Sequence, residues 1–119
     1  MWEKRTAQQQ ALEGGEDLAT LAKGMVEGLL SQGSLDRPEL VDYVLALMQH
    51  NLPEGWIAAL EAMKNRPDAM GALRGMPRKT LVVAGELDRI TPLAESTLIT
   101  RLVADGELVV VKDSSHLPN

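Results

Sequence analysis

Residues 81–92 have the sequence LVVAGELDRITP and residues 108–119 have LVVVKDSSHLPN, and these two stretches decide the fold class. Each begins with aliphatic, mostly β-branched residues, which is typical of a buried strand, and then continues into a polar loop. Between them, Thr91-Pro92 predicts the start of a helix, with Thr91 as N-cap and Pro92 at the first helical position. A short helix between two strands favours a parallel pair joined by a right-handed crossover, and therefore an α/β fold.

An acid and a histidine follow the two predicted strands. Asp88 comes four residues after Ala84, and His116 comes five residues after Val111. Because open α/β sheets place their chemistry at the carboxyl ends of the strands, we expect both side chains at one edge of the sheet. An Asp that orients a His is the acid–base half of a nucleophilic triad, so we predict both as catalytic residues. Glu86 is an alternative acid, and ordinary solvated loop residues are the alternative interpretation for the pair.

These two segments resemble parts of the α/β-hydrolase superfamily, whose triad runs nucleophile, acid, histidine along the chain. Residues 81–92 are similar to the family's G-x-x-D-x-x-x-P segment, and residues 114–119 are similar to its histidine loop. Family members usually have glycine before the histidine, where this chain has Ser115. The resemblance implies that His116 deprotonates a serine nucleophile while Asp88 orients the imidazole.

The first part of the chain has the patterns of helices. Apolar residues recur at helical spacing from about Glu16 to Ser31, and again in two later segments. Two pairs of residues three positions apart, each enclosing a proline, predict capping boxes at the starts of the later helices; the pairs are Asp36 with Glu39, and Asn51 with Glu54. Gln32-Gly33-Ser34 indicates a turn.

Two regions follow from this pattern. We predict a helical cap-like region over residues 1–76 and the strand–helix–strand part of a hydrolase core over residues 77–119. The helices look like the cap of the enol-lactonase and carboxylesterase branch, and residues 66–77 resemble the linker that leaves that cap. In such enzymes the cap shapes the substrate pocket, so Trp56 and Met63 are candidate substrate contacts. The alternative is that both are core residues of the helical part.

No nucleophile is evident in the sequence. There is no G-x-S-x-G motif and no Cys, and none of the serines lies on a predicted strand-to-helix turn. We therefore interpret the chain as a fragment of an ester or lactone hydrolase that is inactive alone and needs a complementing N-terminal half. The alternative is a structural or interaction module that associates with itself and performs no catalysis.

Two parallel strands alone do not make a stable sheet, because parallel sheets are normally buried on both faces. Each strand also leaves an unpaired edge of amide and carbonyl groups. We therefore expect this partial fold to be completed by a homo-oligomer or by the missing hydrolase half, and we do not expect an isolated monomer.

Composition excludes several other classes of protein. The formal net charge of −5 argues against nucleic-acid binding, and no apolar run approaches the length of a membrane span. No secretory signal is visible and there is no cysteine, so a cytoplasmic location is the expectation. No residues cluster at metal-ligand spacing, and we expect neither a metal nor another cofactor.

Overall fold

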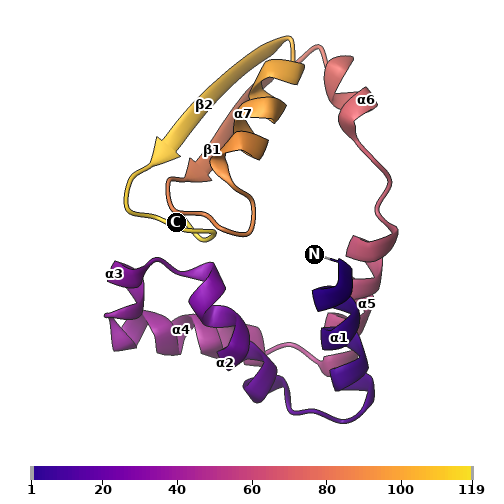
Figure 1. Ribbon diagram of the computed structural model, residues 1–119, viewed down its shortest axis with the longest axis vertical. Helices are drawn as coiled ribbons and strands as arrows, with labels where there is room; N and C mark the ends of the chain where they lie inside the picture. The colour runs from indigo at the N-terminus through magenta and orange to yellow at the C-terminus, as the bar shows by residue number, and fades with distance from the viewer. Residues whose placement is uncertain (1, 119) are drawn as a thin grey trace. The chain divides into compact units, whose positions relative to one another are not determined.

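The computed structural model describes residues 2–118, apart from the side chain of Trp2. Helices come first in the chain, and the two strands flank the last helix (Figure 1). The elements are α1 (Trp2–Glu13), α2 (Leu18–Leu29), α3 (Gln32–Leu35), α4 (Pro38–Gln49), α5 (Pro53–Asn65), α6 (Met70–Arg74), β1 (Lys79–Gly85), α7 (Leu93–Leu102) and β2 (Asp105–Val111). This is the predicted order of a helical segment followed by strand, helix and strand.

Backbone contacts divide the chain into two compact units. The helical unit comprises residues 1–26 and 38–67, and the sheet unit comprises residues 27–37 and 68–119. The segment from the end of α2 through α3 thus belongs to the same unit as the C-terminal strands, although it lies among the helices in sequence. The domain boundary predicted at residue 76 stays a prediction.

The helical unit has an aliphatic core with one tryptophan. Leu12, Leu18 and Leu60 are buried together, one each from α1, α2 and α5. Trp56 packs against this cluster, and its indole Nε1–H donates to Met48 O over 3.3 Å. The apolar spacing that predicted these helices therefore corresponds to the side that they bury.

The two predicted capping boxes are wrong by one residue. Pro38 and Pro53 are the first residues of α4 and α5, so the N-cap position directly precedes each proline. Asp36 instead ends α3, where its Oδ1 accepts from Gln32 Nε2 over 3.1 Å. Asn51 Nδ2 donates to Leu47 O and Met48 O, and it thereby satisfies carbonyl groups at the end of α4.

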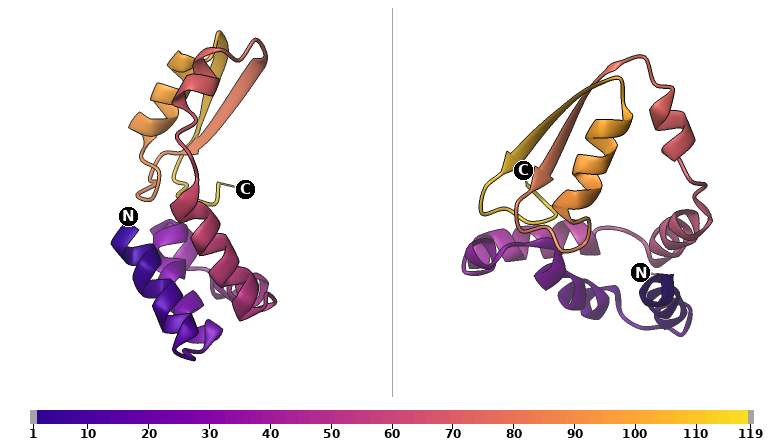
Figure 2. Two further views of the ribbon diagram at one scale, coloured as in Figure 1. Left: turned by 90° about the vertical axis from the view of Figure 1, so that its right-hand side faces the viewer. Right: turned by 45° about the horizontal axis from the view of Figure 1, so that its top comes forward.

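The sheet unit contains the predicted parallel pair. Strands β1 and β2 are hydrogen-bonded neighbours, in register from Lys79↔Asp105 to Gly85↔Val111. Helix α7 packs on one face of this pair (Figure 2). Its N-cap is Pro92 and its first residue is Leu93, so the predicted N-cap at Thr91 is wrong by one position. The Thr91 hydroxyl instead donates to Asp88 Oδ2 within the loop after β1.

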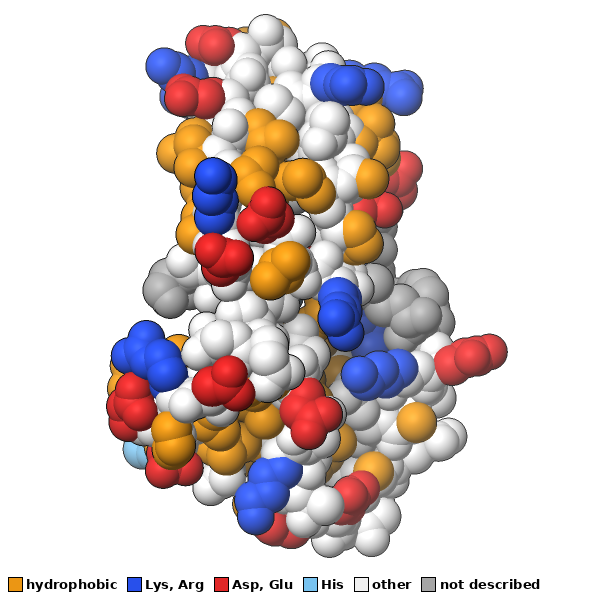
Figure 3. All heavy atoms as spheres, turned by 60° about the vertical axis from the view of Figure 1, so that its left-hand side comes forward, with side chains coloured by type: hydrophobic (Ala, Val, Ile, Leu, Met, Phe, Trp, Pro, Cys, Tyr) orange, Lys and Arg blue, Asp and Glu red, His pale blue; other side chains and the backbone are white. Residues whose placement is uncertain are grey.

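The opposite face of the sheet is open in this chain. Leu81, Val83 and the register partner of Val83, Val109, expose 59%, 51% and 41% of their surface. Figure 3 shows hydrophobic side chains on the surface of the sheet unit. Completion of the fold by a second copy or by another chain stays a prediction, and this exposed face is the reason for it. Among residues 2–118, no helix combines the length and apolar character that a bilayer crossing requires.

Candidate active site

The predicted acid and histidine lie side by side. Asp88 is in the loop after β1, His116 is in the loop after β2, and the two strands run parallel. Asp88 Oδ2 and His116 Nδ1 are 2.9 Å apart. Because an ionised carboxylate can only accept, His116 Nδ1–H is the donor and the carboxylate fixes the tautomer of the ring. The structure thus brings together the two residues that the sequence singled out.

Each oxygen of the Asp88 carboxylate accepts two hydrogen bonds. Its Oδ1 accepts from the backbone N–H groups of Ile90 (2.8 Å) and Thr91 (2.9 Å). Its Oδ2 accepts from Thr91 Oγ1 (2.6 Å) as well as from His116. The Asp88 side chain is only 6% exposed, whereas the His116 side chain is 33% exposed. The acid is therefore held rigidly behind the ring, and the ring remains accessible.

These contacts keep Asp88 ionised. Partial burial by itself would raise the pKa of the Asp88 carboxyl, but hydrogen bonds from the Thr91 hydroxyl, Thr91 N–H, His116 and Ile90 N–H lower it. The net effect moves the pKa from its ordinary 3.8 to about 2. The ionised carboxylate therefore accepts from His116 Nδ1–H at neutral pH and so orients the ring.

This lowered pKa predicts an acid-dependent loss of stability. Since the folded-state pKa (about 2) lies below the ordinary value of 3.8, the stabilisation is fully present above about pH 5. It is lost as the pH falls from about 5 to about 2, and it amounts to about 1–2 kcal/mol after a reduction for screening by solvent. Urea unfolding followed between pH 6 and pH 2 measures this contribution. The Asp88→Asn variant should show a correspondingly weaker dependence in that window, and an unchanged dependence would contradict the assignment.

A set of backbone contacts joins the acid loop to the histidine loop. Glu86 N–H donates to Val111 O over 3.0 Å, and Leu87 N–H donates to Ser114 O over 2.8 Å. Glu86 Oε2 accepts from Asp113 N–H over 3.2 Å. Asp88, and not the alternative acid Glu86, therefore contacts the histidine, while Glu86 connects the two loops.

The departure from the family pattern at Ser115 causes no backbone strain. Ser115 is 5% exposed, and Asp113 is the only described non-glycine residue with a positive φ, at 55°. The close approach is instead made by Gly85, where an added Cβ would lie 2.0 Å from Ser115 O and 2.7 Å from Ser114 O. The glycine at the end of β1 thus allows the histidine loop to lie directly against the strand.

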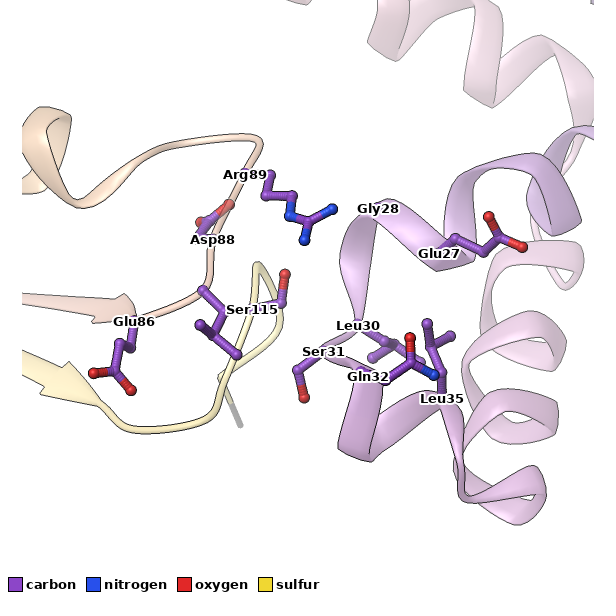
Figure 4. A pocket seen from close by; sticks show the side chains of 11 residues that line it. Glu27, Gly28, Leu30, Ser31, Gln32, Leu35, Glu86, Asp88, Arg89 and Ser115 are labelled. Atoms are coloured by element: carbon purple, nitrogen blue, oxygen red, sulfur yellow. The ribbon is translucent and has the colours of Figure 1, made fainter.

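A cavity of about 350 Å³ lies beside Asp88 within the sheet unit (Figure 4). Residues from the loops after both strands line it, together with residues from the end of α2 and from α3. The lining residues are Glu27, Gly28, Leu30, Ser31, Gln32, Leu35, Glu86, Leu87, Asp88, Arg89 and Ser115. Leu117 N–H donates to Leu29 O over 3.2 Å, which ties the histidine loop to the same helix end. Sequence reasoning missed segment 27–37 because nothing in its composition indicates a contact with loops in the last third of the chain.

The two candidate substrate contacts lie in the helical unit. Trp56 is partly buried in the core cluster, and Met63 is 38% exposed on α5. The backbone carbonyl of Met63 accepts from Arg5 Nη1 over 3.4 Å. Their role in binding a substrate stays a prediction.

Within residues 2–118, no three His, Cys, Asp or Glu side chains are grouped so that they could hold a metal ion.

The hydrogen bonds that the described residues make to the His116 ring are both at Nδ1, with Asp88 Oδ2 and Thr91 Oγ1. The site that these residues form is thus an oriented imidazole with a second nitrogen, Nε2, available for proton transfer.

Known structures share this arrangement of elements. Neither a family model nor a curated protein matches the sequence. A thermophilic esterase from Thermogutta terrifontis, solved with malate bound, is 27% identical with a TM-score of 0.89, covering 98% of this chain and 43% of the esterase. A hydrolase from Pseudomonas aeruginosa is 25% identical with a TM-score of 0.87, covering 99% of this chain and 44% of the hydrolase. An enol-lactonase from Burkholderia xenovorans matches at 19% identity and a TM-score of 0.86, over 96% of this chain and 43% of the lactonase. The chain spans less than half the length of the structures that it matches.

Proposed function

We propose that this chain, whose fold is part of an α/β-hydrolase fold, provides the acid and the histidine of an ester or lactone hydrolase. The observation that carries the proposal is the 2.9 Å contact between Asp88 Oδ2 and His116 Nδ1 at the carboxyl ends of neighbouring parallel strands. An ionised acid that holds one ring nitrogen leaves the other nitrogen to act as general base and general acid.

In the proposed reaction, His116 Nε2 accepts the proton of a serine hydroxyl as the serine oxygen bonds to the carbonyl carbon of the substrate. The resulting imidazolium keeps its Nδ1–H on Asp88, which stabilises the new charge. Nε2 then donates its proton to the leaving oxygen, which departs and leaves an acyl-serine. A water molecule then attacks the acyl carbon while His116 Nε2 accepts its proton. The serine oxygen takes that proton back as the carboxylic acid product leaves.

The nucleophile and the oxyanion hole come from outside these 119 residues. The chain has no G-x-S-x-G motif and no Cys, and Asp88 already has a donor at each oxygen. The partner that we propose is the N-terminal part of a hydrolase, either as a separate polypeptide or as a preceding segment of the same one. The names of two matched structures, an esterase and an enol-lactonase, support a carboxylic ester or lactone as the substrate class. Trp56 and Met63 are the candidate substrate contacts from the helical unit.

Complementation tests this function directly. The chain is mixed or co-expressed with the part of the Thermogutta esterase that lies outside the matched region, and hydrolysis of a short p-nitrophenyl ester is followed. We expect little turnover from either polypeptide alone and clear turnover from the mixture. Replacing the serine of the added half with alanine should abolish the gain. A mixture that forms a stable complex but does not hydrolyse esters or lactones would contradict the catalytic role.

One observation favours a second candidate, a structural module that associates with itself. The exposed sheet face formed by Leu81, Val83 and Val109 would be covered in a homo-oligomer. Light scattering after size-exclusion chromatography, across a range of concentrations, distinguishes the two. A discrete closed oligomer that is inert in the complementation assay supports the structural module. A chain that becomes monodisperse only with the N-terminal half supports the hydrolase.

A further inference from the structure

We propose that Thr91 is a positioning residue of the acid–histidine pair, with its hydroxyl fixing the Asp88 carboxylate and offering His116 Nδ1 a second acceptor. The inference rests on the proposed function, because positioning matters for catalysis only if the pair is catalytic. That Thr91 fixes the Asp88 carboxylate does not depend on catalysis, because it follows from the contacts of the Thr91 side chain.

The geometry around the Thr91 hydroxyl determines the direction of its hydrogen bond. Thr91 Oγ1 lies 2.6 Å from Asp88 Oδ2 and 3.3 Å from His116 Nδ1. The single hydroxyl proton points to the anion, because that contact is shorter and charge-assisted. The lone pairs of Oγ1 therefore remain to accept from His116, and Nδ1–H lies between two oxygens.

This hydroxyl has no structural role as a helix cap. The N-cap of α7 is Pro92, and no side-chain hydrogen bond caps that helix. The Thr91 backbone N–H is also directed at Asp88, to Oδ1. Thr91 thus donates to both oxygens of the Asp88 carboxylate. The carboxylate cannot rotate away from the His116 ring without losing one of these hydrogen bonds. Both contacts of Thr91 also help to lower the pKa of Asp88.

The test uses a pair of variants at Thr91 and a matched control. Thr91→Val keeps the shape and removes the hydroxyl, whereas Thr91→Ser keeps the hydroxyl. Thr97→Val is the control, because the Thr97 hydroxyl donates to Leu93 O within α7 and touches neither member of the pair. Carbon-detected NMR titration of the Asp88 carboxyl, in the 119-residue chain with or without its N-terminal partner, gives the pKa of that group.

We expect the Asp88 pKa to rise from about 2 toward 3.8 in Thr91→Val and to stay near 2 in Thr91→Ser and Thr97→Val. In the complemented enzyme, Thr91→Val should lower kcat roughly tenfold with KM little changed, and Thr91→Ser should restore it. A Thr91→Val variant that titrates like the native chain would overturn the inference.

A further readout keeps the inference testable if Thr91→Val does not fold. In the native chain, a nuclear Overhauser effect between the Thr91 side chain and the His116 ring supports the role, and its absence contradicts the contact. Neither the titration nor this measurement needs a nucleophile. A Thr91-dependent Asp88 pKa in a chain that never gains activity would therefore refute the proposed function while leaving the positioning intact.

Discussion

Replacing His116 with alanine should abolish ester hydrolysis by the complemented enzyme, with kcat falling by about 10⁴- to 10⁶-fold. The loss is large because, in the proposed reaction, His116 moves the proton in every step, and no other part of the proposed site can replace it. Its ring is 33% exposed and already oriented by Asp88, so the substitution removes the proton carrier and leaves the surrounding loops in place. Initial rates on a p-nitrophenyl ester measure the effect.

The matched control is the other histidine of the chain. His50 is exposed, follows α4 directly, and donates its backbone N–H to Ala46 O, a contact that alanine preserves. His50→Ala should retain the rate of the native chain. Equal losses in the two variants would indicate a general effect on assembly, and a fully active His116→Ala enzyme would mean that another group acts as base.

Gly85→Ala should be the most damaging single-methyl substitution in the sheet unit. The added Cβ would lie 2.0 Å from Ser115 O and 2.7 Å from Ser114 O, both backbone atoms that cannot rotate away. The histidine loop must then move off the end of β1, at a cost of about 1–3 kcal/mol or more. Because His116 follows Ser115, its distance to Asp88 increases, and a displacement of about 1 Å can cost roughly a hundredfold in rate.

Urea unfolding and the rate of the complemented enzyme together check this prediction. Gly71→Ala is the control, since an added Cβ there meets no atom within 4 Å and the residue lies in helix α6. We expect that variant to be as stable as the native chain or slightly more stable. If Gly85→Ala matched it in both stability and rate, the close approach of the two loops would be incorrect.

Much of the sheet unit follows from local sequence. The aliphatic runs around Val82 and Val109 become β1 and β2, and the acid and histidine that follow them meet because parallel strands present their carboxyl ends together. Strand direction and loop position are properties of short segments. They can therefore be inferred without the rest of the molecule.

The details that sequence reasoning missed depend on contacts across the loops. Thr91 before Pro92 has the composition of an N-cap, yet its hydroxyl serves the Asp88–His116 pair and the helix begins one residue later. Gln32-Gly33-Ser34 has the composition of a turn, yet it forms the short helix α3 within the sheet unit. For Thr91, the contact with His116, 25 residues further along the chain, is information that no local propensity contains.

The proton of the His116 ring gives the most direct test of the acid–histidine assignment. Proton–nitrogen correlation NMR at a pH where the ring is neutral distinguishes the two tautomers. We predict a proton on Nδ1, held by the ionised Asp88, and an unprotonated Nε2 ready to accept from a serine. In Asp88→Ala this preference should disappear. A ring protonated at Nε2 in the native chain would contradict the account, because that nitrogen could then not act as the general base.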